Sequence, residues 1–353
     1  MLPEELAGLS AFQQRAVSSL LAQEGLGAPE MVAPLRGDGS DRRFLRIRAG
    51  GRSLIAVLPS PTHPGAMAEA QAVWQIGRHL WGRQVAVPEL FGFDPDKGIV
   101  LCEDLGDLQL HGLLLDGKTG PAQVVALGRQ AVEILLHMQL EGAVGFDLQW
   151  CWDTPYYDRD LMLTRESGYF WQALCRDFLC IAQMPLGLDD DFRVLAELAG
   201  AQPGGFFLHR DFQSRNLFSA SGRLRVLDFQ GGRFGPLAYD LASFLNDPYI
   251  DLPLSTRSEL FDYYLELLTV RRPELANGFR EGYLWLALQR NLQILGAFAF
   301  LTSVKGKAFF RSYLYPAAVN LRRLLEEPGG RRLPVLRSLA AELPEQLQHL
   351  KNT

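Results

Sequence analysis

The sequence is poor in cysteine and in uninterrupted apolar stretches. Its 353 residues include four cysteines, with no Cys-x-x-Cys pair and no histidine at the spacing of a zinc site, so we expect buried, reduced thiols. The chain starts Met1-Leu2-Pro3-Glu4-Glu5 and lacks the basic start and apolar core of a signal peptide. These absences indicate a cytoplasmic protein, because thiols stay reduced in that compartment.

An excess of positive charge is also missing. The net charge is −5 and the pI is about 5.8, which argues against a broadly basic face for nucleic acid. The most apolar window, residues 283–304, is interrupted by Arg290, Asn291 and Gln293, which a membrane span tolerates poorly. We therefore expect a buried helix there, no nucleic-acid or membrane partner, and a monomer rather than an oligomer.

The secondary-structure pattern places strands first and helices afterwards. Apolar alternation predicts strands at residues 32–35, 44–48, 53–58, 88–93 and 98–102, with helices within 1–25 and at 66–80. Helical periodicity then dominates, at residues 123–139, 158–180, 189–198 and 257–268. This order predicts an α+β fold of two lobes with a cleft between them. We expect a small β-rich N-terminal lobe at residues 1–105 and a larger, mainly helical lobe at 106–353.

A group of polar residues follows two short apolar runs in the helical lobe. The run at 206–208 precedes His209-Arg210-Asp211 and Asn216, and the run at 224–227 precedes Asp228. We predict that the two runs pair as a hairpin around a turn region at 219–222. This hairpin would bring Asp211, Asn216 and Asp228 together at one mouth.

The composition of this group suits phosphoryl transfer from ATP. That reaction requires a carboxylate that orients the acceptor hydroxyl, oxygen ligands for Mg²⁺, and positive groups that offset developing charge. Asp211 can fill the first role. Asn216 and Asp228 can fill the second, because Mg²⁺ prefers hard oxygen ligands. Arg210 or Arg215 can fill the third. Turn or cap residues are the alternative explanation, but the spacings and flanking strands favour the chemical one.

The same residues resemble the signature of the protein-kinase-like superfamily. The segment from His209 to Asn216 and the pair Asp228-Phe229 match its catalytic and metal-binding segments. Tyr239-Asp240-Leu241 is similar to the aminoglycoside phosphotransferase and choline kinase branch. Within that branch, Leu227 to Gln230 and Gly235-Pro236 look most like the bacterial cell-wall sugar kinases. Those enzymes phosphorylate the anomeric hydroxyl of N-acetylmuramate and N-acetylglucosamine.

The resemblance implies a protein-kinase-like fold with ATP between the lobes and Asp211 as the catalytic base. It implies that Asn216 and Asp228 hold Mg²⁺. It also implies a linker, from Glu103 to Leu105, that offers backbone groups to adenine. The remaining implied contacts are a glycine-bearing loop over the phosphates and a helix glutamate: Gly37, Gly39, Ser40 and Glu69.

One family feature is absent. Superfamily members usually carry a lysine in the strand that corresponds to residues 53–58, where it pairs with the helix glutamate and the phosphates, but this strand has none. The cell-wall sugar kinases that the chain resembles also lack it. Arg42 or Arg43 can substitute, since arginine is a good phosphate partner. We select Arg43 as the candidate.

Other polar and aromatic residues are assigned supporting or substrate roles. We expect His209 to pack and form hydrogen bonds, and Asp240 to brace the catalytic loop. Glu166 and Asp247 are candidates for contact with sugar hydroxyls. An aromatic cluster could stack on a sugar, but such clusters more often pack at helix edges: Trp150, Trp152, Tyr156 and Tyr157.

The pattern as a whole predicts a kinase that uses ATP and Mg²⁺ to phosphorylate a sugar hydroxyl. Two other functions stay open. An aminoglycoside or amino-alcohol kinase would use an acidic pocket for its cationic substrate, and the candidate residues are Asp153, Asp158, Asp160 and Glu166. A nucleotide-binding scaffold without turnover would explain the missing lysine, although it would not require the complete catalytic set. The sequence specifies neither the sugar nor the hydroxyl.

Overall fold

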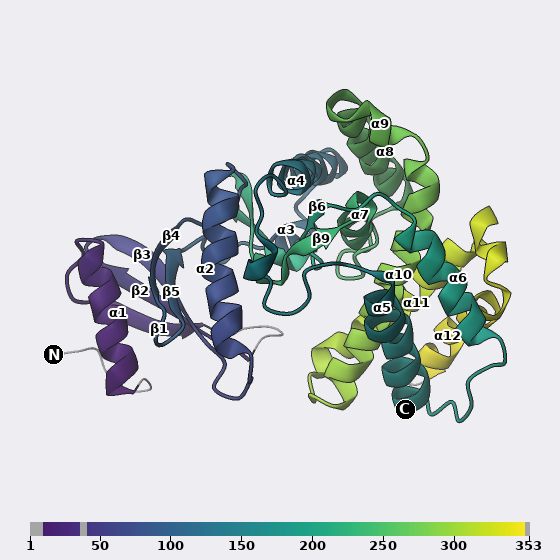
Figure 1. The fold of residues 1–353 in the computed structure, drawn as a ribbon, viewed down its shortest axis with the longest axis horizontal. Coiled ribbons are helices and arrows are strands. Elements are labelled where there is room, and N and C mark those ends of the chain that lie inside the picture. The colour runs from purple at the N-terminus through teal and green to yellow at the C-terminus, as the bar shows by residue number, and fades with distance from the viewer. Residues whose placement is uncertain (1–9, 36–40, 350–353) are drawn as a thin grey trace.

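The computed structural model describes residues 10–35 and 41–349, which form a β-rich lobe beside a mainly helical lobe (Figure 1). The predicted α+β, two-lobed architecture is therefore confirmed. The N-terminal lobe contains α1 (Ala11–Gln23), β1 (Met31–Leu35), β2 (Arg43–Ala49), β3 (Arg52–Leu58), α2 (Ala66–Gly82), β4 (Leu90–Asp94) and β5 (Ile99–Glu103). The first helix begins after Ser10, whose hydroxyl accepts a hydrogen bond from the backbone N–H of Gln13 in a capping box.

The N-terminal lobe is built on a five-stranded antiparallel sheet in the order β1-β2-β3-β5-β4. Alternate residues of a strand face opposite sides of its sheet. Leu45 and Ile47 of β2 are buried in the core that contains α1, whereas Phe44 and Arg46 line the cleft toward the other lobe. The predicted alternation is confirmed, and it gives the sheet one face for packing and one for the cleft.

The C-terminal lobe is mainly helical. Its helices are α3 (Leu110–Leu115), α4 (Pro121–Glu141), α5 (Arg159–Leu161), the π-helical segments η3 (Met162–Ser167) and η4 (Phe170–Phe178), α6 (Leu188–Gly200), α7 (Leu237–Leu245), α8 (Leu254–Arg271), α9 (Pro273–Ala276), α10 (Phe279–Ser303), α11 (Leu314–Glu326) and α12 (Pro334–His349). Short 3₁₀ turns are η2 (Leu148–Trp150), η5 (Ser214–Asn216), η6 (Phe229–Gly231), η7 (Ala308–Tyr313) and η8 (Pro328–Arg332).

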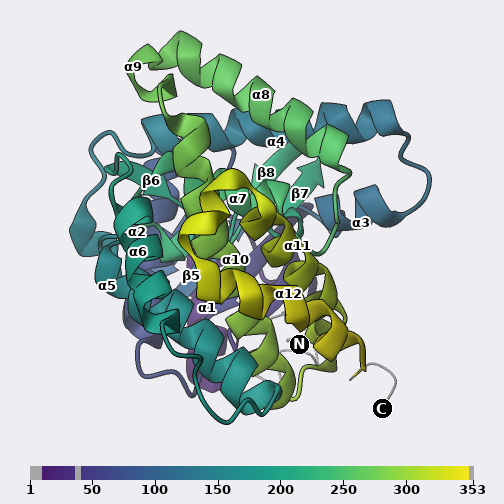
Figure 2. The same ribbon diagram turned by 90° about the vertical axis from the view of Figure 1, so that its right-hand side faces the viewer.

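The centre of this lobe is α10. This helix packs against α6, α7, α11 and both π-helical segments, and α11 and α12 cover one side of it (Figure 2). By length and composition α10 could span a membrane, but 72% of its most apolar window is buried inside the protein. The polar residues Gln289, Arg290 and Asn291 are buried within it as well. The predicted buried helix is therefore confirmed.

Four short strands carry the polar segment singled out in the sequence: β6 (Phe206–Leu208), β7 (Leu217–Ala220), β8 (Arg223–Val226) and β9 (Arg233–Gly235). The predicted pairing of residues 206–208 with 224–227 is wrong. Instead, β6 pairs with β9, and β8 pairs with β7. The reason is a two-residue turn at Ser221-Gly222, whose φ angles of 52° and 78° fit the twist of a tight hairpin between β7 and β8.

Apolar packing is continuous between the lobes through α2. A smaller core lies between α1 and the sheet, whereas Ala72, Ile76 and Leu80 of α2 belong to the larger core of the helical lobe. Gly77 allows a close approach, because a Cβ at this position would lie 2.8 Å from Cε2 of Phe229. The division at residue 105 remains a proposal, and the packing continues across it.

The four cysteines are free thiols. Cys102 and Cys175 are buried, as predicted, and burial raises the pKa of each thiol to about 12. Cys151 is half-buried. Cys180 is exposed, which corrects the expectation of burial: it lies just beyond the end of η4 and has a φ of 58°.

Candidate active site

A cleft of about 830 Å³ lies between the sheet and the helical lobe. On the side of the N-terminal lobe the cleft is lined by apolar residues of the sheet, which include Phe44, Ile55 and Val57. The predicted linker, Glu103 to Leu105, and the two residues after it also line the cleft, and the helical lobe contributes Asp211, Asn216 and Asp228. An apolar slot with a few polar groups at one side is the usual form of a small-molecule site. The structure therefore brings the predicted catalytic group and the predicted linker together.

The loop that carries Asp211 is held by buried hydrogen bonds. Asp240 of α7 accepts from the backbone N–H groups of His209 (2.7 Å) and Arg210 (2.9 Å), which secures the loop although Arg210 has a φ of 78°. The ring of His209 contacts the carbonyl oxygen of Leu227 at 2.9 Å. Burial raises the pKa of Asp240 to about 6. These contacts agree with the supporting roles expected for His209 and Asp240.

Asp211 faces the cleft and is paired with a buried arginine. Its side chain is 43% exposed, and Nη2 of Arg290 lies 3.0 Å from its Oδ1. Arg290 extends from α10 and donates further hydrogen bonds to Ser243 (3.0 Å) and Gln293 (2.6 Å). The guanidinium thus orients the carboxylate. The sequence analysis did not assign Arg290 to the site. The feature that could have indicated it is a charged residue inside the most apolar window of the chain.

Asn216 and Asp228 lie beside each other because the backbone N–H of Leu227 donates to the carbonyl oxygen of Asn216 at 2.9 Å. The side-chain amide of Asn216 donates to the backbone carbonyl of Asp211 at 2.8 Å, which leaves its amide oxygen available. Burial by itself raises the pKa of Asp228. The positive charge of Arg42 and a hydrogen bond from Gln230 lower the pKa by more than burial raises it, so the net pKa is below the ordinary value. Asp228 is therefore an ionised carboxylate.

This donor set fits a magnesium ion that also binds phosphates. Two protein oxygen ligands suit Mg²⁺, which keeps several waters and is usually shared with substrate phosphates. Within residues 10–35 and 41–349, no group of three His, Cys, Asp or Glu side chains could hold a metal ion by itself. Asn216 and Asp228 would thus hold a metal ion that arrives with a nucleotide, and we keep the metal as a proposal.

The cation beside Asp228 is Arg42 and not the selected candidate, Arg43. Nη2 of Arg42 lies 2.5 Å from Oδ1 of Asp228, and its Nε lies 3.6 Å from Oε1 of Glu69. Arg43 is exposed and does not line the cleft. The reason is strand alternation, which puts Arg42 on the cleft side with Phe44 and puts Arg43 on the opposite side.

The other predicted nucleotide contacts differ in outcome. Gly37, Gly39 and Ser40 lie outside the described residues. Glu103 and Leu105 line the cleft as predicted, but the carboxylate of Glu103 is bound to Arg225 at 2.6 Å. An adenine contact at the linker therefore falls to its backbone groups and stays a prediction.

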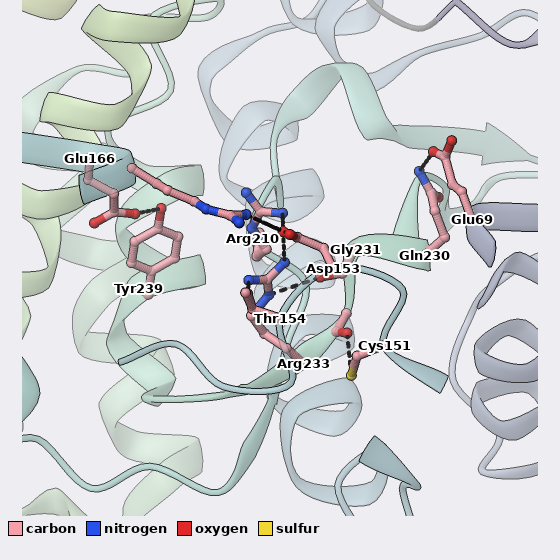
Figure 3. A network of polar contacts seen from close by, with 12 residues as sticks. Glu69, Cys151, Asp153, Thr154, Glu166, Arg210, Gln230, Gly231, Arg233 and Tyr239 are labelled. Atoms are coloured by element: carbon pink, nitrogen blue, oxygen red, sulfur yellow. Dashed lines mark hydrogen bonds and ion pairs between the residues drawn. The ribbon is translucent and has the colours of Figure 1, made fainter. Parts of the chain in front are cut away.

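Glu166 and Asp247 do not line the cleft described here, which corrects the prediction that they contact sugar hydroxyls. Glu166 is buried and accepts hydrogen bonds from the hydroxyls of Tyr157 (2.6 Å) and Tyr239 (2.5 Å; Figure 3). Burial raises its pKa to about 7. Asp247 is buried and accepts from the backbone N–H and the hydroxyl of Ser214. Both carboxylates brace the interior, because their hydrogen-bond capacity is used by their own chain.

The acidic residues suggested for a cationic substrate also lie outside the cleft, as far as the structure describes its lining. Asp153 is held by Arg165 at 2.6 Å and by Arg233 at 3.0 Å, beside Arg210 (Figure 3). Asp158 caps α5 through a hydrogen bond from the backbone N–H of Leu161. These carboxylates therefore stabilise the helical lobe. The aromatic cluster packs there too, with Trp150 5.5 Å from the ring of Phe146.

The end of the cleft beyond Asp211 is aromatic and basic. We call it the acceptor end, and it includes Gln213, Arg215, Tyr249, Arg290, Gln293 and Phe298. The guanidinium of Arg215 lies over the ring of Tyr249 at 5.3 Å. Apart from Asp211, the described residues of this end carry no carboxylate. The acceptor end thus suits a neutral or anionic molecule with an apolar face better than a cation.

The two lobes and the cleft group of Asp211, Asn216 and Asp228 define a small-molecule kinase of protein-kinase-like fold. The phosphotransferase enzyme family matches residues 32–276, and the chain belongs to this family. It is accordingly an ATP-dependent phosphotransferase that acts on a small molecule.

Relatives agree with this assignment, and solved structures share the fold. The chain is 31% identical over 317 residues to an N-acetylmuramate/N-acetylglucosamine kinase of Neisseria meningitidis, covering 87% of this chain and 88% of that one. It is 26% identical over 352 residues to the kinase of the same name in Pseudomonas aeruginosa, covering 96% of each. Choline kinase LicA from Streptococcus pneumoniae shares the fold with a TM-score of 0.60 at 10% identity, over 88% of this chain and 99% of that one.

Proposed function

We propose that this protein is a cytoplasmic kinase that phosphorylates the anomeric 1-hydroxyl of an N-acetylated amino sugar with MgATP. The acceptor is N-acetylmuramate or N-acetylglucosamine, and the reaction would serve the recycling of cell-wall sugars. The observation that carries this proposal is the aromatic and basic acceptor end, in which Asp211 is the one carboxylate among the described residues. Arg215 and Arg290 suit the lactyl carboxylate of N-acetylmuramate. The kinases of that name in two bacteria support the choice.

In the proposed mechanism, Asp211 orients the acceptor hydroxyl and receives its proton during transfer. Arg290 fixes the orientation of this carboxylate from within α10. Asn216 and Asp228 would hold Mg²⁺, which would offset the charge of the phosphates. Because the protein does little covalent chemistry, positioning and electrostatics supply the rate enhancement.

Product analysis after incubation with ATP, Mg²⁺ and candidate acceptors tests this function. We expect an acid-labile anomeric phosphate from the N-acetyl sugars, and little product from choline or aminoglycosides. The variant Asp211→Asn tests the catalytic base. It should lower kcat by about 10²–10⁴-fold, the usual cost of losing a positioned acid–base group, while the affinity for an ATP analogue stays unchanged. Near-normal turnover by Asp211→Asn would exclude it as the base.

The same acceptor panel distinguishes the two other functions. Phosphorylation of choline or of an aminoglycoside, without any sugar product, would make the protein a kinase of cationic substrates. ATP binding without phosphorylation of any acceptor would make it a nucleotide-binding scaffold. Neither result is expected, because Asp211 is the one carboxylate among the described residues of the acceptor end, and the catalytic group is assembled in the cleft.

A further inference from the structure

Arg42 links the two lobes at the candidate metal ligand. It directly precedes β2, whose first residue pairs with Leu58 at the end of β3, so it enters the cleft at that end of the sheet. It forms ion pairs with Asp228 of the helical lobe and with Glu69 of α2. Only 11% of the Arg42 side chain and 15% of the Glu69 side chain are exposed, so this ion pair is largely shielded from water, whereas the Asp228 side chain is 38% exposed.

The other described cations that line the cleft are engaged elsewhere. Arg46 is bound to Asp104 of the linker and to Asp107 just after it, and Arg215 and Arg290 lie at the acceptor end. Arg42 is therefore the described cation placed between the linker and the acceptor, which is where the phosphates of a nucleotide have to lie. In the absence of the strand lysine, its guanidinium is the available partner for them.

We propose that Arg42 is a positioning residue that exchanges partners when the nucleotide binds. In the arrangement of the structure, its guanidinium neutralises Asp228 at a carboxylate oxygen that is also a candidate ligand of Mg²⁺. When MgATP binds, the guanidinium leaves Asp228 for the phosphates and keeps its ion pair with Glu69. This inference rests on the proposed use of MgATP, but it does not depend on which acceptor is phosphorylated.

Electrostatics provide the reason for the exchange. A guanidinium and a divalent cation on one carboxylate repel each other, so the arrival of the metal ion disfavours the ion pair of Arg42 with Asp228. Arginine binds phosphate through two parallel hydrogen bonds, which offers the guanidinium a better partner. Glu69 remains as its anchor, and Gln230 donates to Glu69 (3.3 Å; Figure 3) and to Asp228 (3.0 Å).

The exchange couples the metal ion to the nucleotide. A divalent cation that arrives alone must displace Arg42 without offering it a new partner, so its affinity should be low. A cation that arrives with phosphates supplies that partner at the same time. The protein would thus select the metal–nucleotide complex over either component.

The test measures the binding of Mn²⁺ alone, as a paramagnetic substitute for Mg²⁺, and of a magnesium complex of a non-hydrolysable ATP analogue. Arg42→Gln should bind Mn²⁺ about tenfold more tightly than the unaltered protein, and the nucleotide about 10- to 100-fold more weakly, the range expected for losing a hydrogen bond to a charged group. Arg48→Gln is the matched control, because Arg48 is an exposed arginine of the adjoining strand β2 and does not line the cleft. It should change neither affinity.

The opposite signs separate this role from simple destabilisation, which would weaken both affinities. Arg42→Lys keeps the charge on a shorter side chain and should give intermediate values for both ligands. An Arg42→Gln variant whose Mn²⁺ affinity is unchanged or lower, or whose nucleotide affinity is unchanged, would overturn the proposal. Since no acceptor is present, a failure to phosphorylate N-acetylmuramate would refute the proposed function and leave these results standing.

Discussion

At the scale of single residues, the pair of Arg290 and Asp211 is the contact with the most direct effect on catalysis. Arg290 is buried, whereas the carboxylate of Asp211 is 43% exposed, so the loss of Arg290 acts mainly on the orientation of this carboxylate. We expect Arg290→Gln to lower kcat by about 10²-fold, with ATP-analogue affinity unchanged, because the carboxylate loses its orientation while the nucleotide end is intact.

Steady-state kinetics and calorimetric titration check this expectation. Arg290→Lys is the control, because it retains the charge and should recover part of kcat. A variant that loses ATP affinity as strongly as kcat would show that Arg290 supports the whole lobe and does not act through Asp211.

The buried carboxyl of Glu166 predicts a pH dependence of stability. Burial raises its pKa from an ordinary value of 4.5 to about 7 in the folded protein, so folding favours the protonated form. Its contribution is fully present below pH 4.5 and is lost as the pH rises through about 7. This loss corresponds to about 3 kcal/mol of unfolding free energy.

Urea unfolding at several pH values, with Glu166→Gln as the reference, measures this contribution. The free energy of unfolding of the unaltered protein, relative to that of Glu166→Gln, should fall between pH 4.5 and 7. A difference that does not depend on pH would show that Glu166 is ionised when buried.

The sequence predicted some site residues and not others for physical reasons. Asp211, Asn216 and Asp228 could be grouped because their spacing follows from one loop and the strand after it. The period of two in β2 could also have separated Arg42 from Arg43. By contrast, a carboxylate such as Glu166 has the same local pattern whether it faces a cleft or two tyrosine hydroxyls, and only the tertiary structure decides between them.

At the scale of elements, α2 positions Glu69 against the loop of Asp228 through the contact of Gly77 with Phe229. Gly77→Ala should destabilise the protein by about 1–2 kcal/mol, because overpacking there exceeds the gain in helix propensity. It should also weaken nucleotide binding by separating Glu69 from Asp228. Gly82→Ala in the same helix is the control, since a Cβ there meets no atom within 4 Å.

Thermal unfolding and nucleotide titration of both variants decide this point. If Gly77→Ala and Gly82→Ala change stability and nucleotide affinity equally, close packing at Gly77 does not position α2.

The strand pairing of the helical lobe could not be predicted from the apolar pattern of the sequence. The apolar runs at β6 and β8 were visible in the sequence, but their partners β9 and β7 are three and four residues long. Strands this short carry little periodicity. Their pairing depends on the turn at Ser221-Gly222 and on contacts with helices that are distant in sequence, so the hairpin could not be assigned correctly. The long helices and the N-terminal sheet were predictable, because their apolar periods extend over many residues.

At the scale of the whole molecule, a ligand bound by both lobes should stabilise the folded chain. MgATP at 100 times its Kd should raise the free energy of unfolding by about 2.7 kcal/mol through mass action alone. Asp228→Ala should remove the part of this stabilisation that depends on Mg²⁺, because one of two protein ligands is lost.

Thermal unfolding with ATP, with Mg²⁺ and with both checks this prediction. Stabilisation of Asp228→Ala by MgATP equal to that of the unaltered protein would contradict the assignment of Asp228 as a metal ligand.

The position of α2 in the larger core also determines how the chain can be divided. A cut in the linker at Gly106 would leave Ile76 and Leu80 exposed on the N-terminal fragment, and would uncover their partners on the other. Neither fragment would be expected to remain soluble alone, whereas the two expressed together should reassemble by complementation. Because α2 packs into the core of the helical lobe, we expect that neither lobe could be exchanged for the lobe of a distant relative unless α2 and its contact surface were exchanged with it.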